Sequence, residues 1–151
     1  MQQTIQTFLI LFTSTLWASG QTACTTKDDI TLIKDFISDI ADESLRPDVI
    51  LSRHVLLEQT TADEEYDYLE ASIEEIKINL QLKNLDEIAY IPFQALSKKE
   101  TYDIDAEGKP TDKMYFLRYK NRQMLAIYIA KDKIASFTLV SKGDRAHFVT
   151  Y

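Results

Sequence analysis

Apolar residues recur every three or four positions in the stretch that follows the first charged residues of the chain. Four isoleucines and one phenylalanine follow this spacing: Ile30, Ile33, Phe36, Ile37 and Ile40. Side chains three and four residues apart share one face of an α-helix. The spacing predicts an amphipathic helix from residue 28, and either Asp28 or Asp29 is suited to cap its N-terminus.

Two further helices are predicted between residues 47 and 80. Pro47 suits the first turn of a short helix that continues towards Leu57; an extended segment is the alternative, because β-branched residues are frequent there. In the next segment Thr61 and Glu64 have the spacing of a capping box. Apolar residues then mark one helical face for about four turns. These residues are Tyr66, Leu69, Ile73, Ile76 and Leu80.

After Leu85 the pattern changes to that of β-strands. Short runs rich in β-branched and aromatic residues alternate with polar separators of hairpin size. The runs are 88–96, 113–120, 123–131, 134–141 and 146–151. Connections this short do not allow parallel crossovers, so the last four runs are predicted to form an antiparallel meander. Pro92 places the first run at a sheet edge or on a bulge.

Helices followed by antiparallel strands predict an α+β fold, with three N-terminal helices packed on a sheet of four to five strands. Residues 28–151 contain no glycine- or proline-rich linker and no internal repeat, so we expect one domain. A chain of this length buries enough apolar surface to fold without covalent cross-links.

The order of these elements and the hairpin series of residues 125–137, LAIYIAKDKIASF, resemble the nuclear-transport-factor-like superfamily of cone-shaped, cystatin-like α+β domains. The resemblance implies a strongly curved sheet and a pocket between its concave face and the helices. The strand that this family usually inserts between its second and third helices is not evident, so cystatin-like and other helix-on-sheet arrangements stay open. The superfamily includes enzymes, ligand-binding domains and structural domains, so the fold does not decide the activity.

Aromatic and apolar side chains on the strands are the pocket candidates that this resemblance implies. They are Tyr115, Leu117, Tyr119, Tyr128, Phe137 and Phe148. Both faces of the strands are apolar, so the sequence does not separate a concave from a convex side. The alternative is that these side chains pack in the core, as most aromatic residues do.

The residues before Lys27, the first charged residue of the chain, have the pattern of an export signal. An apolar run at 8–12 precedes small residues at 18–20, as in a secretory signal peptide, and the run is too short to span a bilayer. The run lacks the usual preceding Lys or Arg, and a buried N-terminal helix is the alternative. The pattern predicts a signal peptide at 1–20, a disordered tail at 21–27 and a periplasmic, cell-surface or extracellular protein.

Cys24 is the one cysteine of the chain, so no disulfide can form within one molecule. A lipid anchor on Cys24 is an alternative to a soluble exported protein, because the small residue Ala23 precedes it. Gln21, however, stands where a lipoprotein signal usually has a Leu-like residue. Without an anchor, Cys24 is a thiol on the tail.

Charge is distributed unevenly along the chain, whose net charge is −7. Residues 1–111 carry 9 basic and 21 acidic side chains, whereas residues 112–151 carry 8 basic and 3 acidic ones. An acidic protein is poorly suited to bind nucleic acid or anionic lipid. We expect acidic helices and basic strands to attract one another, within one molecule or across a homodimer. The acidic face of the third helix is interpreted as solvated, with cation binding or partner docking as the alternative.

Two histidines are the candidates for acid–base chemistry, because imidazole titrates near neutral pH. A helix would place Glu58 four residues after His54 on the same face. His147 lies in the last run, with only Asp144 nearby. No Gly-x-Ser-x-Gly elbow accompanies them, and surface or capping roles are the alternative for both.

One loop has the first half of a calcium-binding pattern. Asp103, Asp105 and Glu107 are followed by Gly108, which is the order of donors and turn in the first half of an EF-hand loop. Met114 stands where such a loop has its bidentate glutamate, so the pattern predicts at most a weak site, with a polar turn as the alternative. The sequence contains no motif for another metal or for a cofactor.

Export, a single foldable domain and the lack of a catalytic motif together favour a non-catalytic domain that binds a small molecule or a protein. One alternative is an enzyme that uses a histidine–carboxylate pair in a cone-shaped pocket. The other is a structural module that forms a homodimer.

Overall fold

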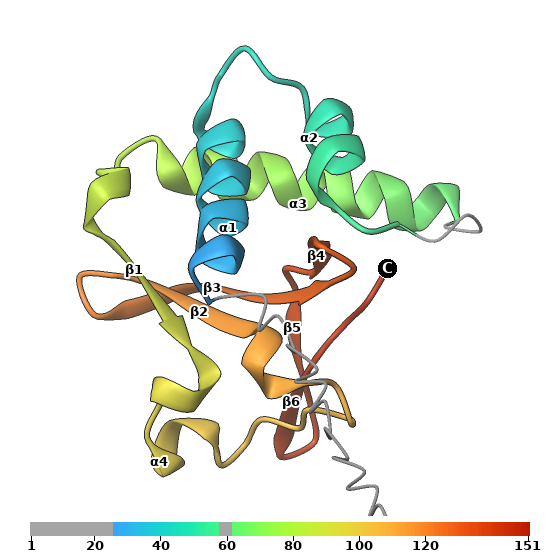
Figure 1. Cartoon of the computed structure of the whole chain (residues 1–151). Helices are drawn as coiled ribbons and strands as arrows, with labels where there is room; N and C mark the ends of the chain where they lie inside the picture. Colours follow the sequence, from blue (N-terminus) through green and yellow to red (C-terminus); the bar gives the residue numbers. More distant parts are fainter. Residues whose placement is uncertain (1–25, 58–61) are drawn as a thin grey trace, which may run out of the picture.

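The computed structural model describes residues 26–57 and 62–151, and it confirms the predicted α+β fold. The three predicted helices lie on one side of an antiparallel sheet, and a short fourth helix follows the first strand (Figure 1). The helices are α1 Thr26–Ala41, α2 Pro47–His54, α3 Asp63–Leu80 and α4 Lys98–Thr101. Within the described ranges, no helix is long and apolar enough to cross a membrane.

The strands of the described residues form two antiparallel sheets. Four strands pair in the order β1-β2-β3-β4, and the last two form a separate hairpin. Their bounds are β1 Ile88–Pro92, β2 Met114–Tyr119, β3 Arg122–Ala130, β4 Lys133–Ser136, β5 Leu139–Lys142 and β6 Arg145–Phe148. The strand that carries Pro92 lies at the edge of the four-stranded sheet, as predicted.

The predicted four-run meander is wrong at residues 134–141, which form two strands in different sheets. Ser136 bends the chain, because its hydroxyl oxygen accepts a hydrogen bond from the Thr138 amide and donates one to the Thr138 carbonyl. Such local side-chain bonds compete with strand pairing. The Tyr151 hydroxyl accepts a hydrogen bond from the Phe137 amide at 3.1 Å and holds the same bend. β5 and β6 therefore leave the main sheet and lie below it in Figure 1.

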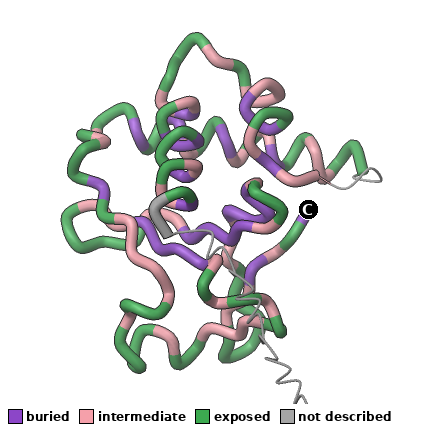
Figure 2. Tube along the Cα trace, viewed as in Figure 1, coloured by how far each residue is buried: buried purple, intermediate pink, exposed green. Residues whose placement is uncertain are grey.

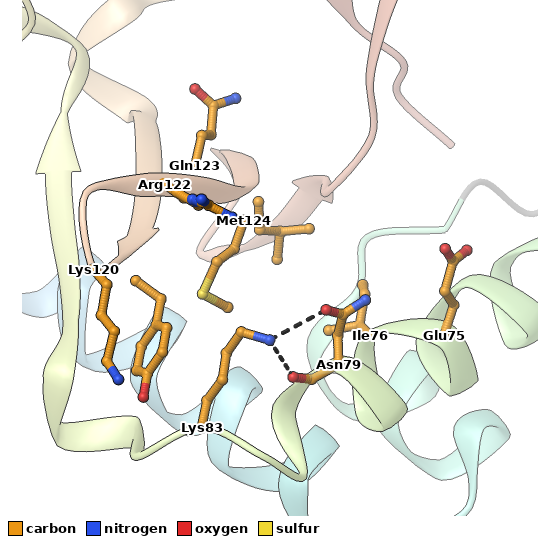
Figure 3. A pocket seen from close by; sticks show the side chains of 10 residues that line it. Glu75, Ile76, Asn79, Lys83, Lys120, Arg122, Gln123 and Met124 are labelled. Atoms are coloured by element: carbon orange, nitrogen blue, oxygen red, sulfur yellow. Dashed lines mark hydrogen bonds between the residues drawn. The ribbon is translucent and has the colours of Figure 1, made fainter.

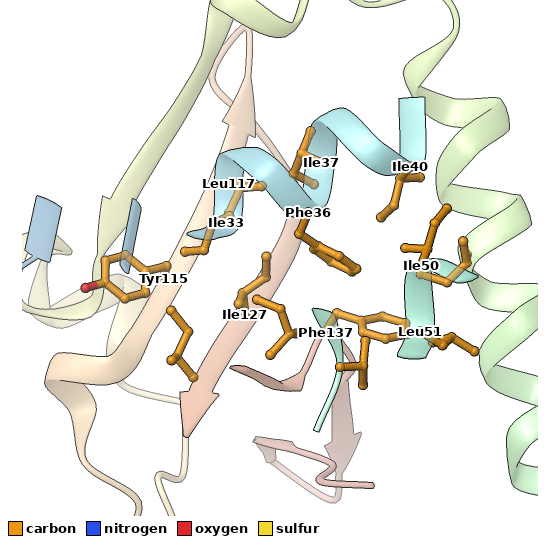
Figure 4. Close-up of a cluster of buried hydrophobic side chains, with 14 of the residues drawn as sticks. Ile33, Phe36, Ile37, Ile40, Ile50, Leu51, Tyr115, Leu117, Ile127 and Phe137 are labelled. Carbon is orange, nitrogen blue, oxygen red and sulfur yellow. The ribbon is translucent and has the colours of Figure 1, made fainter. Parts of the chain in front are cut away.

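The main core lies between the helices and the sheet face that they cover (Figure 2). α1 buries the face that its spacing predicts, and Phe36 is fully buried against the ring of Phe137, at a centroid distance of 5.8 Å. Figure 4 shows Ile33 and Ile37 of α1 beside Leu117 of β2. Burial of several such side chains, each contributing about 1.5–3 kcal/mol, holds the helices on the sheet.

A second core lies on the opposite face of the same sheet. Phe148 of β6 packs there against Phe116 and Tyr128, with ring centroids 6.1 and 6.2 Å apart. The sheet is therefore buried on both faces, which explains why its strands are apolar at consecutive positions rather than alternating.

The starts of two helices differ from their predicted starts. α1 begins at Thr26, so Asp28 and Asp29 lie inside its first turn instead of capping it, where acidic side chains complement the partial positive charge of the helix end. α3 has Ala62 as its N-cap residue, without a side-chain hydrogen bond. Thr61, the expected cap, lies outside the described residues.

Asp29 connects α1 to the sheet. Asp29 is 4 % exposed, and its carboxylate accepts hydrogen bonds from the Lys113 ammonium at 2.9 and 3.0 Å and from the Tyr115 hydroxyl at 2.8 Å. A buried carboxylate is tolerated when it is paired and hydrogen-bonded in this way. These contacts give Asp29 a structural role, because they join the start of α1 to the start of β2.

Candidate functional site

A hollow of about 760 Å³ lies between α3 and the β2–β3 hairpin. α3 provides Glu75, Ile76 and Asn79 to one wall, and the hairpin residues 119–125 provide most of the other (Figure 3). Lys83, just after the end of α3, also lines the hollow. The volume is within the range of about 300–1,000 Å³ that is typical of small-molecule sites.

The floor of this hollow is apolar. Ile76, Met124 and Leu125 are half-buried there, between the core and solvent. Met124 is a bulge residue, because Leu125 pairs with Leu117 and Gln123 pairs with Arg118, which leaves Met124 without a partner in β2. A bulge redirects side chains locally, and here the thioether points into the hollow (Figure 3).

The rim of the hollow is cationic. Lys83, Lys120 and Arg122 line it, opposed by the single carboxylate of Glu75. The ammonium groups of Lys83 and Lys120 lie over the Tyr119 ring, at 5.8 and 5.2 Å from its centroid. An aromatic face attracts cations, so the Tyr119 ring holds both ammonium groups at one end of the hollow.

Lys83 is also held by the end of α3. Its ammonium donates to the Asn79 carbonyl and, at 3.2 Å, to the Asn79 side-chain oxygen. The C-terminus of a helix carries a partial negative charge that favours a cation there. This interaction fixes the position of the charge before any ligand arrives.

The hairpin turn places Lys120 at the rim. Lys120 and Asn121 have φ angles of 48° and 64°, as both central residues of a type I′ turn require. The β3–β4 turn has the same form, with Lys131 and Asp132 at 49° and 56°. The two turns therefore offer matched positions for substitution.

A second, shallower hollow of about 310 Å³ continues from the first along α3. The two share Glu75, Ile76 and residues 123–125, and the second extends to Ser72 and to the bend at 137–139. We call the continuous depression between α3 and β3 the α3–β3 groove. It is elongated, apolar along its floor and positively charged at its hairpin end.

The aromatic pocket candidates do not share one cavity. Tyr115 and Phe137 are buried in the helix-side core, together with Leu117, whereas Tyr128 and Phe148 are buried in the core of the opposite face. Tyr119 lines the large hollow with its ring half-buried, and Phe137 lines the second hollow, so these two candidates lie along the α3–β3 groove.

His54 has a different carboxylate partner from the one expected. Its Nε2 lies 2.7 Å from Asp39 of α1, whose carboxylate also pairs with Arg53 at 2.5 Å. Burial raises the pKa of Asp39, but the hydrogen bonds from His54 and Arg53 outweigh it and lower the pKa below its usual value. Glu58, the expected partner, lies outside the described residues.

The two histidines lie on opposite sides of the four-stranded sheet. His54 ends α2 on the helix side and packs on Phe36, at a centroid distance of 5.7 Å. His147 lies on β6, opposite Val140, in the hairpin below the sheet (Figure 1). They do not converge on one cavity.

The loop with the partial calcium pattern docks on β6. The Asp105 amide donates to the Ala146 carbonyl, and the Ala146 amide donates to the Asp103 carbonyl. The Glu107 carboxylate pairs with Lys109 at 2.7 Å. In the part of the chain that the structure describes, no three acidic, histidine or cysteine side chains converge as a metal site.

Comparison with family models, curated proteins and solved structures finds no match for this chain. The candidate site therefore depends on its own geometry. Sequence reasoning missed Lys83, Lys120, Arg122 and Met124; Lys83 and Met124 are 41 residues apart in the sequence. The available signal was the pair of basic residues around the turn at Asn121, next to a long apolar run.

Proposed function

We propose that this protein is a small exported, non-catalytic binding domain whose α3–β3 groove is the ligand site. The ligand is elongated, with an apolar body and an anionic group at one end. The observation that carries the proposal is the groove itself, in which Lys83, Lys120 and Arg122 surround one end of a floor formed by Ile76 and Met124.

The chemistry of the groove supports this ligand class. Apolar contact along Ile76, Met124 and Leu125 favours a hydrocarbon-like body, since burying apolar area contributes about 25 cal/mol per Å². The cations select the sign of the polar end and accelerate the encounter with an anion. Glu75, on the α3 wall, disfavours a ligand that is anionic along its whole length.

The enzyme alternative depends on His54, which has a carboxylate partner in Asp39. The adjoining hollow of about 350 Å³ is lined by three acidic or polar residues of α1, Asp28, Thr31 and Asp35, and by Leu32. The Asp39 carboxylate is shared with Arg53, and His147 is on the far side of the sheet. The arrangement favours a structural role in joining α1 to α2.

Export and the homodimer alternative are tested on the protein itself. We expect the protein recovered from cells to begin at Gln21. A chain that begins at Met1 would contradict export. A lipid on Cys24 would show that the exported protein is membrane-anchored. Sedimentation of the mature protein at high micromolar concentration should show a monomer. A dimer there would favour the structural module.

Calorimetric titration with dodecanoate, below its micelle threshold, tests the groove. We expect dodecanoate to bind, and dodecyltrimethylammonium, which has the same chain and the opposite charge, to bind at least about tenfold more weakly. The double variant Lys120→Asn, Arg122→Gln should weaken dodecanoate binding about tenfold. Its control is Lys131→Asn, Lys142→Gln, which removes two charges from other hairpin turns, one at the matched turn position.

Equal binding of the two amphiphiles, or equal loss in the two double variants, would contradict the proposed site. If neither amphiphile binds to the folded protein, the proposed ligand class is contradicted.

A further inference from the structure

Within the described residues, one edge of β3 has no strand partner along most of its length. β3 spans nine residues, but its pairing with β4 covers only Tyr128–Ala130. Among the described strands, none pairs with this edge from residue 122 to 127. The other edge of β3 pairs with β2 from Arg122 to Tyr128, apart from the bulge at Met124.

The bend at Ser136 leaves this edge open. Ser136 pairs with Tyr128, so a strand that continued straight to residue 141 would run beside β3 as far as Gln123. The chain instead turns away at Phe137 and Thr138 and forms β5 in the second sheet. The unpaired edge is accessible at residues 122–125, which are exposed or half-buried, whereas Ala126 and Ile127 are buried.

Backbone groups of β3 are directed towards this unpaired edge. Ala130 and Lys133 flank a two-residue turn, and residues in that position form a hydrogen-bonded pair, so the backbone groups of Ala130 face β4. Backbone groups alternate in direction along a strand, so those of Tyr128 and Ala126 face the same side. Ala126 has no β4 partner there, but it is buried. At the accessible end of β3, Tyr119 and Arg122 flank the other two-residue turn, so the backbone groups of Arg122 face β2 and those of the exposed Gln123 face the unpaired edge.

The groove thus joins an open strand edge to an apolar floor and a cationic end. We infer that its ligand is an extended peptide segment of a partner protein, which adds a strand to the open edge of β3 and places an acidic side chain against Lys83, Lys120 and Arg122. Strand addition obtains its affinity from main-chain hydrogen bonds and its specificity from alternate side chains. The inference rests on the proposed function, because it names the ligand class of the same groove.

A peptide fits this edge better than a second copy of the chain. α3 stands beside the edge and forms one wall of the groove. Two copies that paired β3 to β3 would bring their α3 helices together, and both would present the exposed carboxylates of Glu74 and Glu75. Like charges that are brought close together repel, whereas a single strand avoids this contact.

The probe is the blocked peptide acetyl-Glu-Glu-Val-Thr-Val-Thr-Val-amide, mixed at millimolar concentration with the mature protein. Hydrogen exchange followed by NMR should slow at the amides of residues 123–127 that face the groove, and not in the β5–β6 hairpin. The peptide with Lys-Lys in place of Glu-Glu should bind at least about tenfold more weakly. The double variant Lys120→Asn, Arg122→Gln should weaken binding of the acidic peptide by a similar factor. The Lys131→Asn, Lys142→Gln control should leave this binding unchanged.

Two N-methylated versions of the acidic peptide test strand addition itself. Each carries methyl groups on one of the two alternate sets of amides, and only one set faces β3. We expect one version to lose binding and the other to keep it within about threefold, since a missing donor interrupts the ladder. Equal affinity of the two versions, or unchanged exchange at 123–127 with the unmethylated peptide, would overturn the inference.

The two experiments separate the two proposals. Dodecanoate binding in the groove without peptide binding would overturn strand addition and leave the proposed function intact. Failure of both probes would overturn both.

Discussion

The two ends of β3 differ in what surrounds the same strand. At residues 128–130, β3 pairs with β4, at Tyr128 also with β2, and Ile129 is fully buried in the core. At residues 122–127 it pairs with β2 alone, and Met124 and Leu125 stay half-buried in the groove. The difference arises from the bend at Ser136, which ends β4 after four residues. The local hydrogen bonds of Ser136 therefore separate the part of β3 that is paired on the β4 side from the part that lines the proposed ligand site.

The largest expected effect comes from truncating one apolar side chain at each end. Ile129→Ala removes a buried side chain at the closed end and should lower the free energy of unfolding by about 3 kcal/mol. Met124→Ala at the open end should cost about 1 kcal/mol or less, because its side chain is partly solvated, and should weaken dodecanoate binding. Urea unfolding gives both stabilities. Equal costs would show that Met124 belongs to the core, which would contradict the groove.

The bend itself is the next target. Ser136→Ala removes the hydroxyl oxygen that accepts from the Thr138 amide, and it should lower the free energy of unfolding by about 1–2 kcal/mol. Ser141→Ala, which removes an exposed hydroxyl from β5, is the matched control and should cost less than about 0.5 kcal/mol. Equal costs in urea unfolding would mean that the bend does not depend on Ser136.

The smallest expected effect concerns Arg118, a basic residue of the hairpin that is held away from the groove rim. Glu100 pairs with it and also accepts hydrogen bonds from the hydroxyl and amide of Ser97. The Ser97 and Arg118 hydrogen bonds lower the pKa of Glu100 from 4.5 to about 2. A lowered folded-state pKa adds stability above the unfolded value, and this stability is lost as the pH falls through the folded value.

Glu100→Gln should therefore lower the melting temperature slightly at neutral pH, and the difference from the unchanged protein should disappear as the pH falls from 4.5 to about 2. Thermal melts over this pH range measure it. Glu74→Gln, on the exposed face of α3, removes the same charge without these partners and serves as control. A difference for Glu100→Gln that stays constant down to pH 2 would contradict the role of the Ser97 and Arg118 contacts.

Most of the fold follows from local patterns in the sequence. The spacing of Ile33, Phe36 and Ile37 predicts the buried face of α1, and Pro47 predicts the start of α2. The strands and their antiparallel pairing follow from apolar runs with short separators. These features need only neighbours along the chain, so periodicity and turn chemistry suffice to predict them.

The candidate site was harder to predict, because it depends on contacts between distant segments. The 134–141 run is apolar enough for one strand, and its bend depends on Ser136, Thr138 and Tyr151, whose hydroxyls meet only in the folded chain. His54 likewise finds Asp39 on another helix instead of an acid on its own. The spacing of these residues along the sequence does not predict the distances between them in the fold.

The most direct test of the account is a map of amide chemical-shift changes on titrating the mature protein with dodecanoate. Binding in the α3–β3 groove predicts the largest shifts at Lys83 and at residues 120–126, with none at the matched β3–β4 turn around Lys131. Shifts centred instead on His54 and the α1 residues beside it would place the site in the histidine hollow and contradict the proposed groove.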